Sequence, residues 1–160
     1  MKRPTALFVI FFAAALGAAS VRAEIREMRV RLPSLPPPTG AEQICEKRMV
    51  VPRTQGAESC FIDERVTRVP GVLRYPCSGD GWAKAAFGPA LFLGRVDHGQ
   101  VALTLNTEFD FSDHCTWSTE QTLRGALSSG GLDYAYTEHP NAGQRGCASS
   151  CRATARATFR

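Results

Sequence analysis

An antiparallel all-β fold is the architecture that this 160-residue sequence predicts. From about residue 70, runs of alternating apolar and polar residues recur at roughly 8- to 14-residue intervals between turn residues, which is typical of such domains. No long amphipathic helix pattern accompanies them. Six cysteines provide for disulfide bonds. We therefore expect a meander of about six to eight strands, barrel-like or as a curved sheet, stapled by disulfides and preceded by an irregular N-terminal third.

Residues 1–23 have the three parts of a cleavable secretory signal peptide. Lys2 and Arg3 are positive, an uncharged apolar run follows over 7–19, and Val21-Arg22-Ala23 has small residues at the two positions that a signal peptidase reads. The apolar run is shorter than the roughly 20 residues that a membrane-spanning helix needs. We predict cleavage after Ala23 or nearby and export to the periplasm or beyond the cell. An uncleaved N-terminal anchor is the alternative.

The segment 24–69 is predicted to be irregular and Pro-rich, with short strands. Residues 24–32 alternate in the manner of a strand. The prolines of 33–38 then favour an extended connector, since proline locks its own backbone and restricts the residue before it. A short helical turn is expected over 41–48, and a strand followed by a loop over 49–57.

The segment 70–160 is predicted to be the antiparallel β domain. Its clearest strand is 101–111, where apolar residues at most odd positions alternate with polar residues over the whole run, as in a long half-buried strand. Tight turns such as Asp97-His98-Gly99-Gln100 join the strands, because glycine readily adopts the positive φ that such turns need. The expected strands are 71–75, 82–87, 90–96, 101–111, 115–126, 132–137 and 151–160.

Short turns between consecutive strands favour pairing of neighbours in the sheet. Each strand has one apolar face, and that face must be covered. Two arrangements satisfy this requirement: a small up-and-down barrel, or a curved sheet closed by the N-terminal segment. We favour the barrel, because no long amphipathic helix is available as a lid.

All six cysteines lie beyond the predicted cleavage site, and an even number in an exported chain favours disulfides. They are Cys45, Cys60, Cys77, Cys115, Cys147 and Cys151. Six cysteines allow 15 connectivities. We predict Cys45–Cys60 as one bond, and one or both of Cys147 and Cys151 bonded to Cys77 and Cys115. No histidine follows the last two cysteines at metal-finger spacing, so we expect no metal site and no other cofactor.

The net charge of +4 falls to +1 when the predicted signal peptide is removed, because three of the 19 basic residues lie in it. The remaining chain has 16 basic and 15 acidic residues. A nearly neutral chain has no electrostatic basis for general nucleic-acid or membrane-surface binding, and no membrane span is expected after signal cleavage. Residues 75–139 carry a net charge of −5, whereas 140–160 carry +4. This imbalance favours pairing between strands or a local surface for a protein or carbohydrate partner. It does not indicate the oligomeric state.

Glu108, Asp110 and Glu120 form a candidate surface site on the polar faces of two strands predicted to pair. Two close carboxylates can divide acid–base work between them, and several can bind calcium. The polar face of a strand also carries such residues without function, and arginines of the last strand could neutralise them. We therefore favour a solvated face, and keep a small exported hydrolase as an alternative.

Tyr134 and Tyr136 are a second candidate surface site, since they share one face of their predicted strand. Facing inward they would be core, which is the favoured interpretation; facing outward they would form an aromatic patch for sugars or a protein.

The peptide 75–79, Tyr-Pro-Cys-Ser-Gly, resembles the start of the small exported lysozyme inhibitors, a family of compact barrels. A Ser-Gly-x-x-Tyr element of that family is not found downstream, and we carry no function over from the resemblance.

No catalytic motif emerges: the sequence has neither a Gly-x-Ser-x-Gly elbow nor a Ser-x-x-Lys motif. His98, His114 and His139 are all expected in turns, where they would be solvated. The sequence therefore favours a non-enzymatic exported domain that binds a partner or contributes to the cell envelope. The alternatives are the hydrolase described above and an inhibitor of an envelope-directed enzyme, which would make contact through the loop 144–146.

Overall fold

The computed structural model describes residues 25–31, 43–55, 60, 66–111, 115–141, 147 and 150–160, and its strands form one nine-stranded sheet. The predicted signal peptide, 1–23, lies outside the described residues. The strands are β1 (Ile25–Arg31), β2 (Ile44–Val50), β3 (Pro70–Pro76), β4 (Gly81–Phe87), β5 (Ala90–Asp97), β6 (Gln100–Phe111), β7 (Thr116–Ala126), β8 (Gly131–Pro140) and β9 (Cys151–Phe159).

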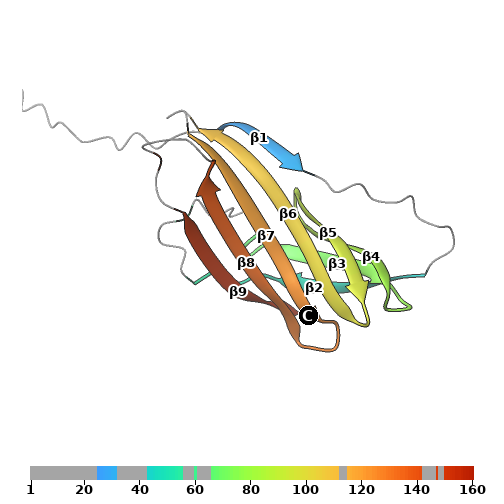
Figure 1. Ribbon diagram of the computed structural model, residues 1–160. Coiled ribbons are helices and arrows are strands. Elements are labelled where there is room, and N and C mark those ends of the chain that lie inside the picture. The colour runs from blue at the N-terminus through green and yellow to red at the C-terminus, as the bar shows by residue number, and fades with distance from the viewer. Residues whose placement is uncertain are drawn as a thin grey trace, which may run out of the picture.

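Strands β2 to β9 close into an eight-stranded antiparallel barrel (Figure 1). Each strand pairs with the next along the chain, and the ring closes where β2 meets β9. That seam is short: Met49 and Val50 pair with Phe159 and Thr158. Gln55 extends the seam through two backbone hydrogen bonds with Thr154, of 2.8 and 3.0 Å. The barrel-like meander predicted from the sequence is confirmed.

Strand β1 lies outside this ring and continues it at one edge. It pairs antiparallel with the part of β6 from Asn106 to Phe111, whereas β5 pairs with the part from Gln100 to Thr104. Strands β1 and β5 therefore pair with the same edge of β6, each along a different part of its length. We call the barrel end at Phe111, where β1 lies, the upper end, and the end with the turns 98–99 and 127–130 the lower end (Figure 1).

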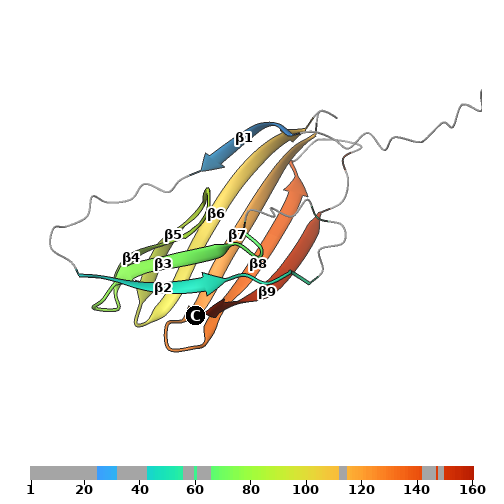
Figure 2. The same cartoon turned by 180° about the vertical axis from the view of Figure 1, so that it is seen from behind.

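The barrel has a short-stranded and a long-stranded half. Strands β2 to β5 have 7 or 8 residues, and β6 to β9 have 9 to 12. Figure 2 shows β2 and β3 crossing the long strands at a steep angle. Because β8 reaches Pro140, His139 lies on a strand, and its predicted place in a turn is wrong. The β5–β6 turn has positive φ at His98 and Gly99, as a two-residue hairpin turn requires.

The predicted helical turn over 41–48 is also wrong. Residues 44–50 form β2, which is paired with β3 over its entire length. The ladder of backbone hydrogen bonds and the disulfide at Cys45 outweigh a weak local helical preference, because tertiary context routinely overrides propensity. The segment 24–69 thus supplies a barrel strand, and it also contributes Val51 and Val66 to the core.

Two apolar clusters fill the interior. The main cluster occupies the barrel, and its largest fully buried side chains include Tyr134, Tyr136, Phe87 and Phe92. A smaller cluster at the upper end consists of Phe109, Cys115 and Trp117 with the half-buried Cys147. Lower down, the Lys47 ammonium donates a 2.6 Å hydrogen bond to the Leu127 carbonyl and lies 4.7 Å from the centre of the Phe159 ring.

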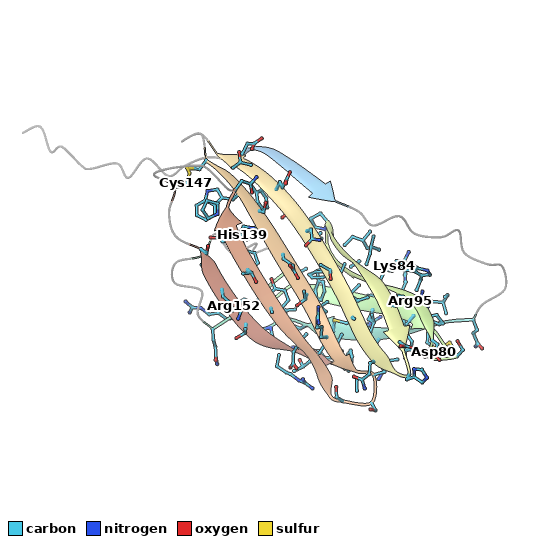
Figure 3. The ribbon with its side chains drawn as sticks, viewed as in Figure 1. Asp80, Lys84, Arg95, His139, Cys147 and Arg152 are labelled. Carbon is cyan, nitrogen blue, oxygen red and sulfur yellow. A yellow bond between two sulfur atoms is a disulfide. The ribbon has the colours of Figure 1, made fainter. Side chains whose placement is uncertain are left out.

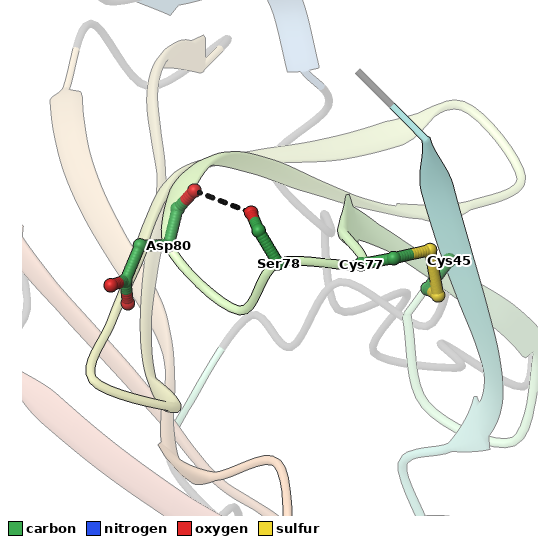
Figure 4. The surroundings of a disulfide bond; sticks show 4 residues. All are labelled: Cys45, Cys77, Ser78 and Asp80. Carbon is green, nitrogen blue, oxygen red and sulfur yellow. Dashed lines mark hydrogen bonds between the residues drawn. A yellow bond between two sulfur atoms is a disulfide. The ribbon is translucent and has the colours of Figure 1, made fainter.

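All six cysteines form disulfides, as predicted: Cys45–Cys77, Cys60–Cys151 and Cys115–Cys147. Their Cα–Cα distances of 5.0, 5.5 and 5.9 Å are within the usual range. The predicted Cys45–Cys60 bond is wrong, because the β2–β3 register brings Cys45 to the end of β3 (Figure 4). The predicted tie between the last two cysteines and the sheet is confirmed by Cys115–Cys147.

The described part of the chain contains no helix with the length and apolar character needed to cross a membrane.

Candidate functional site

The inner faces of β6 to β9 carry side chains in rows that run across the strands. The register places Leu105, Gln121, Tyr136 and Ala153 in one such row. Tyr134 and Tyr136 are 1% exposed and face inward, which is the core interpretation of the sequence. They cannot form the alternative aromatic patch on the surface.

One row of the interior is mainly polar. Thr107, Thr119 and Glu138 stand opposite one another on β6, β7 and β8, and Cys151 follows on β9; we call these four the inner polar row. The two threonine hydroxyls share a 2.5 Å hydrogen bond, and the Tyr136 hydroxyl donates to Glu138 Oε2 at 2.5 Å. Hydrogen bonding of this kind lowers the cost of burying polar groups.

The Gln121 side chain borders this row. Its Oε1 accepts a 2.9 Å hydrogen bond from the Tyr134 hydroxyl. Its Nε2 is buried and has no hydrogen-bond partner among the described residues. A buried amide donor without a partner is costly, so this position is a weak point of the core.

The carboxylate of Glu138 lies beside the Cys60–Cys151 disulfide. One of its oxygens and the two sulfur atoms all lie within 4.8 Å of one another. Glu138 is 2% exposed. The sequence reasoning missed both Glu138 and Gln121, yet the period-two rule contains the signal: Glu138 has the parity of Tyr136, and Gln121 that of Leu123.

The three predicted acidic residues lie on the outer face of the barrel. Glu108 and Asp110 are half-buried, and Glu120 is exposed. Glu108 pairs with Ser118 and Glu120 with Asn106, so the two glutamates are diagonal neighbours. Neighbouring carboxylates are therefore present, but on the convex exterior, whereas catalytic sites are usually concave.

A second outer feature is a row that crosses six strands near the lower end. We call it the outer arginine row, and its register positions are Trp82, Arg95, Ala102, Arg124, Asp133 and Arg156. The Arg95 guanidinium lies 5.5 Å from the centre of the Trp82 ring, and Arg156 donates a 2.5 Å hydrogen bond to Asp133. Arg124 is exposed and has no ion-pair partner within the described ranges.

The next outer row toward the upper end is mostly neutral. Its positions are Lys84, Leu93, Thr104, Thr122, Ala135 and Thr154. Figure 3 shows Lys84 and Arg95 on the short-stranded side of the barrel, apart from His139 and Arg152. Arginines and hydroxyls are thus adjacent across the lower outer face.

The histidines do not form a catalytic pair in the described part of the chain. His98 is exposed in its turn, with Nδ1 2.9 Å from Asp97 Oδ1. His139 is exposed and stands opposite Ser118, whose hydroxyl donates to Asn141 Oδ1 at 2.5 Å. His114 and the loop 144–146 lie outside the described residues.

Comparison with known proteins gives no relative: no family model, no curated protein and no solved structure matches the chain.

Proposed function

We propose that this chain is an exported, non-enzymatic binding protein that contacts an anionic carbohydrate polymer of the cell envelope through the outer arginine row. The observation that carries the proposal is the alignment of Arg95, Arg124 and Arg156 in one row of the sheet. Each arginine is two strands from the next, or about 10 Å. Repeated cations in a straight row complement a chain of repeated anions.

The chemistry of the row supports an anionic partner. Guanidinium groups bind carboxylate, phosphate and sulfate groups in a bidentate manner, which a lysine cannot do. Thr104, Thr122 and Thr154 in the adjacent row offer hydroxyls that both donate and accept hydrogen bonds. Only one carboxylate, Asp133, interrupts the arginine row.

The state of the interior supports binding at the outer face. An eight-stranded barrel is wide enough either for its own side chains or for one small ligand. Here large side chains fill it, among them Phe87, Phe92, Tyr134 and Tyr136.

Export is supported by the three disulfides, which persist mainly in oxidising compartments, and by the signal peptide predicted over 1–23.

Affinity electrophoresis with heparin as an anionic polysaccharide and dextran as an uncharged one tests this proposal. The wild type should bind heparin at low salt, lose binding as salt rises, and ignore dextran. The triple variant Arg95→Gln/Arg124→Gln/Arg156→Gln should bind heparin at least tenfold more weakly, since each charge-assisted hydrogen bond contributes about 1.5–3 kcal/mol. Equal binding by wild type and variant would refute the proposal, as would a wild type that ignores heparin.

The matched control replaces the outer acidic residues: Glu108→Gln/Asp110→Asn/Glu120→Gln should bind heparin at least as well as the wild type. The same variant tests the hydrolase alternative, which the diagonal placement of Glu108 and Glu120 keeps open. If the wild type cleaves a glycan and this variant does not, at an unchanged melting temperature, the barrel is a hydrolase instead.

A further inference from the structure

Among the residues that the structure describes, the Cys60–Cys151 disulfide differs from the other two in having a buried carboxylate beside it. Its sulfur atoms and one Glu138 oxygen lie within 4.8 Å of one another, the only such trio of potential metal ligands in the part of the chain that the structure describes. Glu138 stands directly opposite Cys151 on the neighbouring strand, so the sheet holds two of the three groups in register.

This trio has the composition of a zinc site. Cysteine thiolates and a carboxylate are ordinary Zn²⁺ ligands, with Zn–S near 2.3 Å and Zn–O near 2.0–2.2 Å. Ligand atoms around such a tetrahedral ion lie about 3.4–3.8 Å apart. Rotation of the two cysteine side chains after the S–S bond opens would bring the sulfurs to that separation. The Glu138 carboxylate is already inside the barrel, at 2% exposure, and its Oε2 accepts a hydrogen bond from the Tyr136 hydroxyl.

We propose that the Cys60–Cys151 disulfide masks a Zn²⁺ site, which opens when a dithiol reductant cleaves the bond. One thiolate of the reductant attacks a sulfur of the bond, and its second thiol then closes the reductant's own disulfide. The protein gains two electrons and two protons as two thiols. Zn²⁺ then binds both sulfurs and the Glu138 carboxylate, releasing the two thiol protons to solvent, and water takes the fourth position.

The location gives the exchange a structural consequence. The bond ties Cys60, between β2 and β3, to the first residue of β9, close to the Gln55–Thr154 bridge at the barrel seam. A zinc ion held by the same two cysteines keeps the same tie. The barrel would thus stay closed at this point in both redox states, with a metal ion in place of the covalent bond.

Cobalt spectroscopy on the reduced protein tests the proposal. The mature chain is reduced with dithiothreitol, freed of it without oxygen, and titrated with Co²⁺, whose visible d–d bands and thiolate charge-transfer band report tetrahedral sulfur ligation. The wild type should show both bands, and Zn²⁺ should abolish them. The serine pair Cys60→Ser/Cys151→Ser should show neither band. Glu138→Gln, which keeps a hydrogen-bond acceptor for Tyr136, should bind Co²⁺ at least about tenfold more weakly.

Three control variants isolate the site. The pairs Cys45→Ser/Cys77→Ser and Cys115→Ser/Cys147→Ser, and the exposed substitution Glu120→Gln, should leave the bands intact. Bands that persist without Cys60 and Cys151, or wild-type affinity in Glu138→Gln, would overturn the proposal. Circular dichroism decides the remaining case: if the reduced chain has lost its β spectrum and neither ion restores it, the proposal also fails, because metal binding to a true site drives folding.

Discussion

The lower and upper parts of the barrel interior differ in chemistry. In the lower part, the rows across β6 to β9 are apolar: Leu103, Leu123, Tyr134 and Ala155 form one of them. In the upper part, the inner polar row replaces aliphatic side chains with hydroxyls, a carboxylate and a disulfide. The comparison teaches that one closed sheet uses two kinds of stabilisation. Burial of apolar surface dominates below, whereas above it is joined by hydrogen bonds between buried side chains and by a covalent bond.

Size complementarity accounts for the apolar part. Strand β9 presents small residues to the interior, including Ala153 and Ala157, and these belong to the same buried cluster as the large rings of β8 and β5. The Phe92 ring packs edge-to-face against Phe87 and Tyr134, with centroids 5.8 and 6.5 Å apart. Alternation of large and small residues is how small barrels fill their interior.

A large effect on stability is expected in this apolar part. Phe92→Ala should lower the free energy of unfolding by about 3–5 kcal/mol, because it removes a ring that is fully buried and leaves a cavity. Denaturant titration under oxidising conditions measures the loss. The control is Leu91→Ala on the outward face of the same strand, which should cost clearly less. Equal losses would show that the barrel interior is not the main source of stability.

The next effect compares two disulfides. Cys60 and Cys151 are 91 residues apart, whereas Cys115 and Cys147 are 32 apart. Chain entropy predicts losses of about 4.6 kcal/mol for Cys60→Ser/Cys151→Ser and about 3.7 kcal/mol for Cys115→Ser/Cys147→Ser. Melting curves of the two variants measure the difference. A greater loss in the second variant would mean that local packing, not loop length, determines the contribution of each bond.

A smaller effect is expected in the inner polar row. Thr107→Val or Thr119→Val alone should cost about 1–3 kcal/mol, because each leaves the other hydroxyl without this partner. The double variant should cost less than the sum of the two, since it removes both polar groups and keeps the volume. A double-mutant cycle on the free energy of unfolding measures this coupling. Strict additivity would show that the two hydroxyls do not depend on each other.

The smallest effect is expected on the outer face. Asp133→Asn breaks the ion pair with Arg156, whose side chains are 73% and 48% exposed. Exposed pairs contribute about 0.2–1 kcal/mol and are screened by salt. The change in unfolding free energy should shrink further at high salt. Glu46→Gln, which breaks the exposed pair with Arg74, should behave the same way. A loss of unfolding free energy above about 2 kcal/mol would show that ion pairs on this face also contribute strongly to stability.

Much of the barrel follows from local patterns. The alternation in 101–111 predicts β6 to within one residue, and the turn at His98-Gly99 follows from residue type. Where the local pattern was weak, the prediction failed. Residues 41–48 have no clear period in the sequence, and it is the partner strand β3 that makes residues 44–50 a strand. Likewise, β8 continues to Pro140 because β7 offers it a partner that far.

The candidate sites were less predictable, because they depend on which residues the register brings together. The acidic residues were found from residue type alone, but their convex setting is a property of the closed sheet. The outer arginine row joins residues from six strands, 82 to 156 in the chain, and no local pattern links them. Glu138 was overlooked because the strand predicted over 132–137 ends one residue before it, whereas β8 continues to Pro140.

By itself, the sequence determined the neighbour pairing of β3 to β9, the inward side of most of these strands and the presence of disulfides, since these depend on period-two alternation, short turns and cysteine number. Only the tertiary structure decided which cysteines pair, how the seam closes and which polar groups share the interior. The physical reason is distance along the chain: contacts such as Cys60–Cys151 join residues far apart in sequence, and their proximity arises only when eight strands close into one ring.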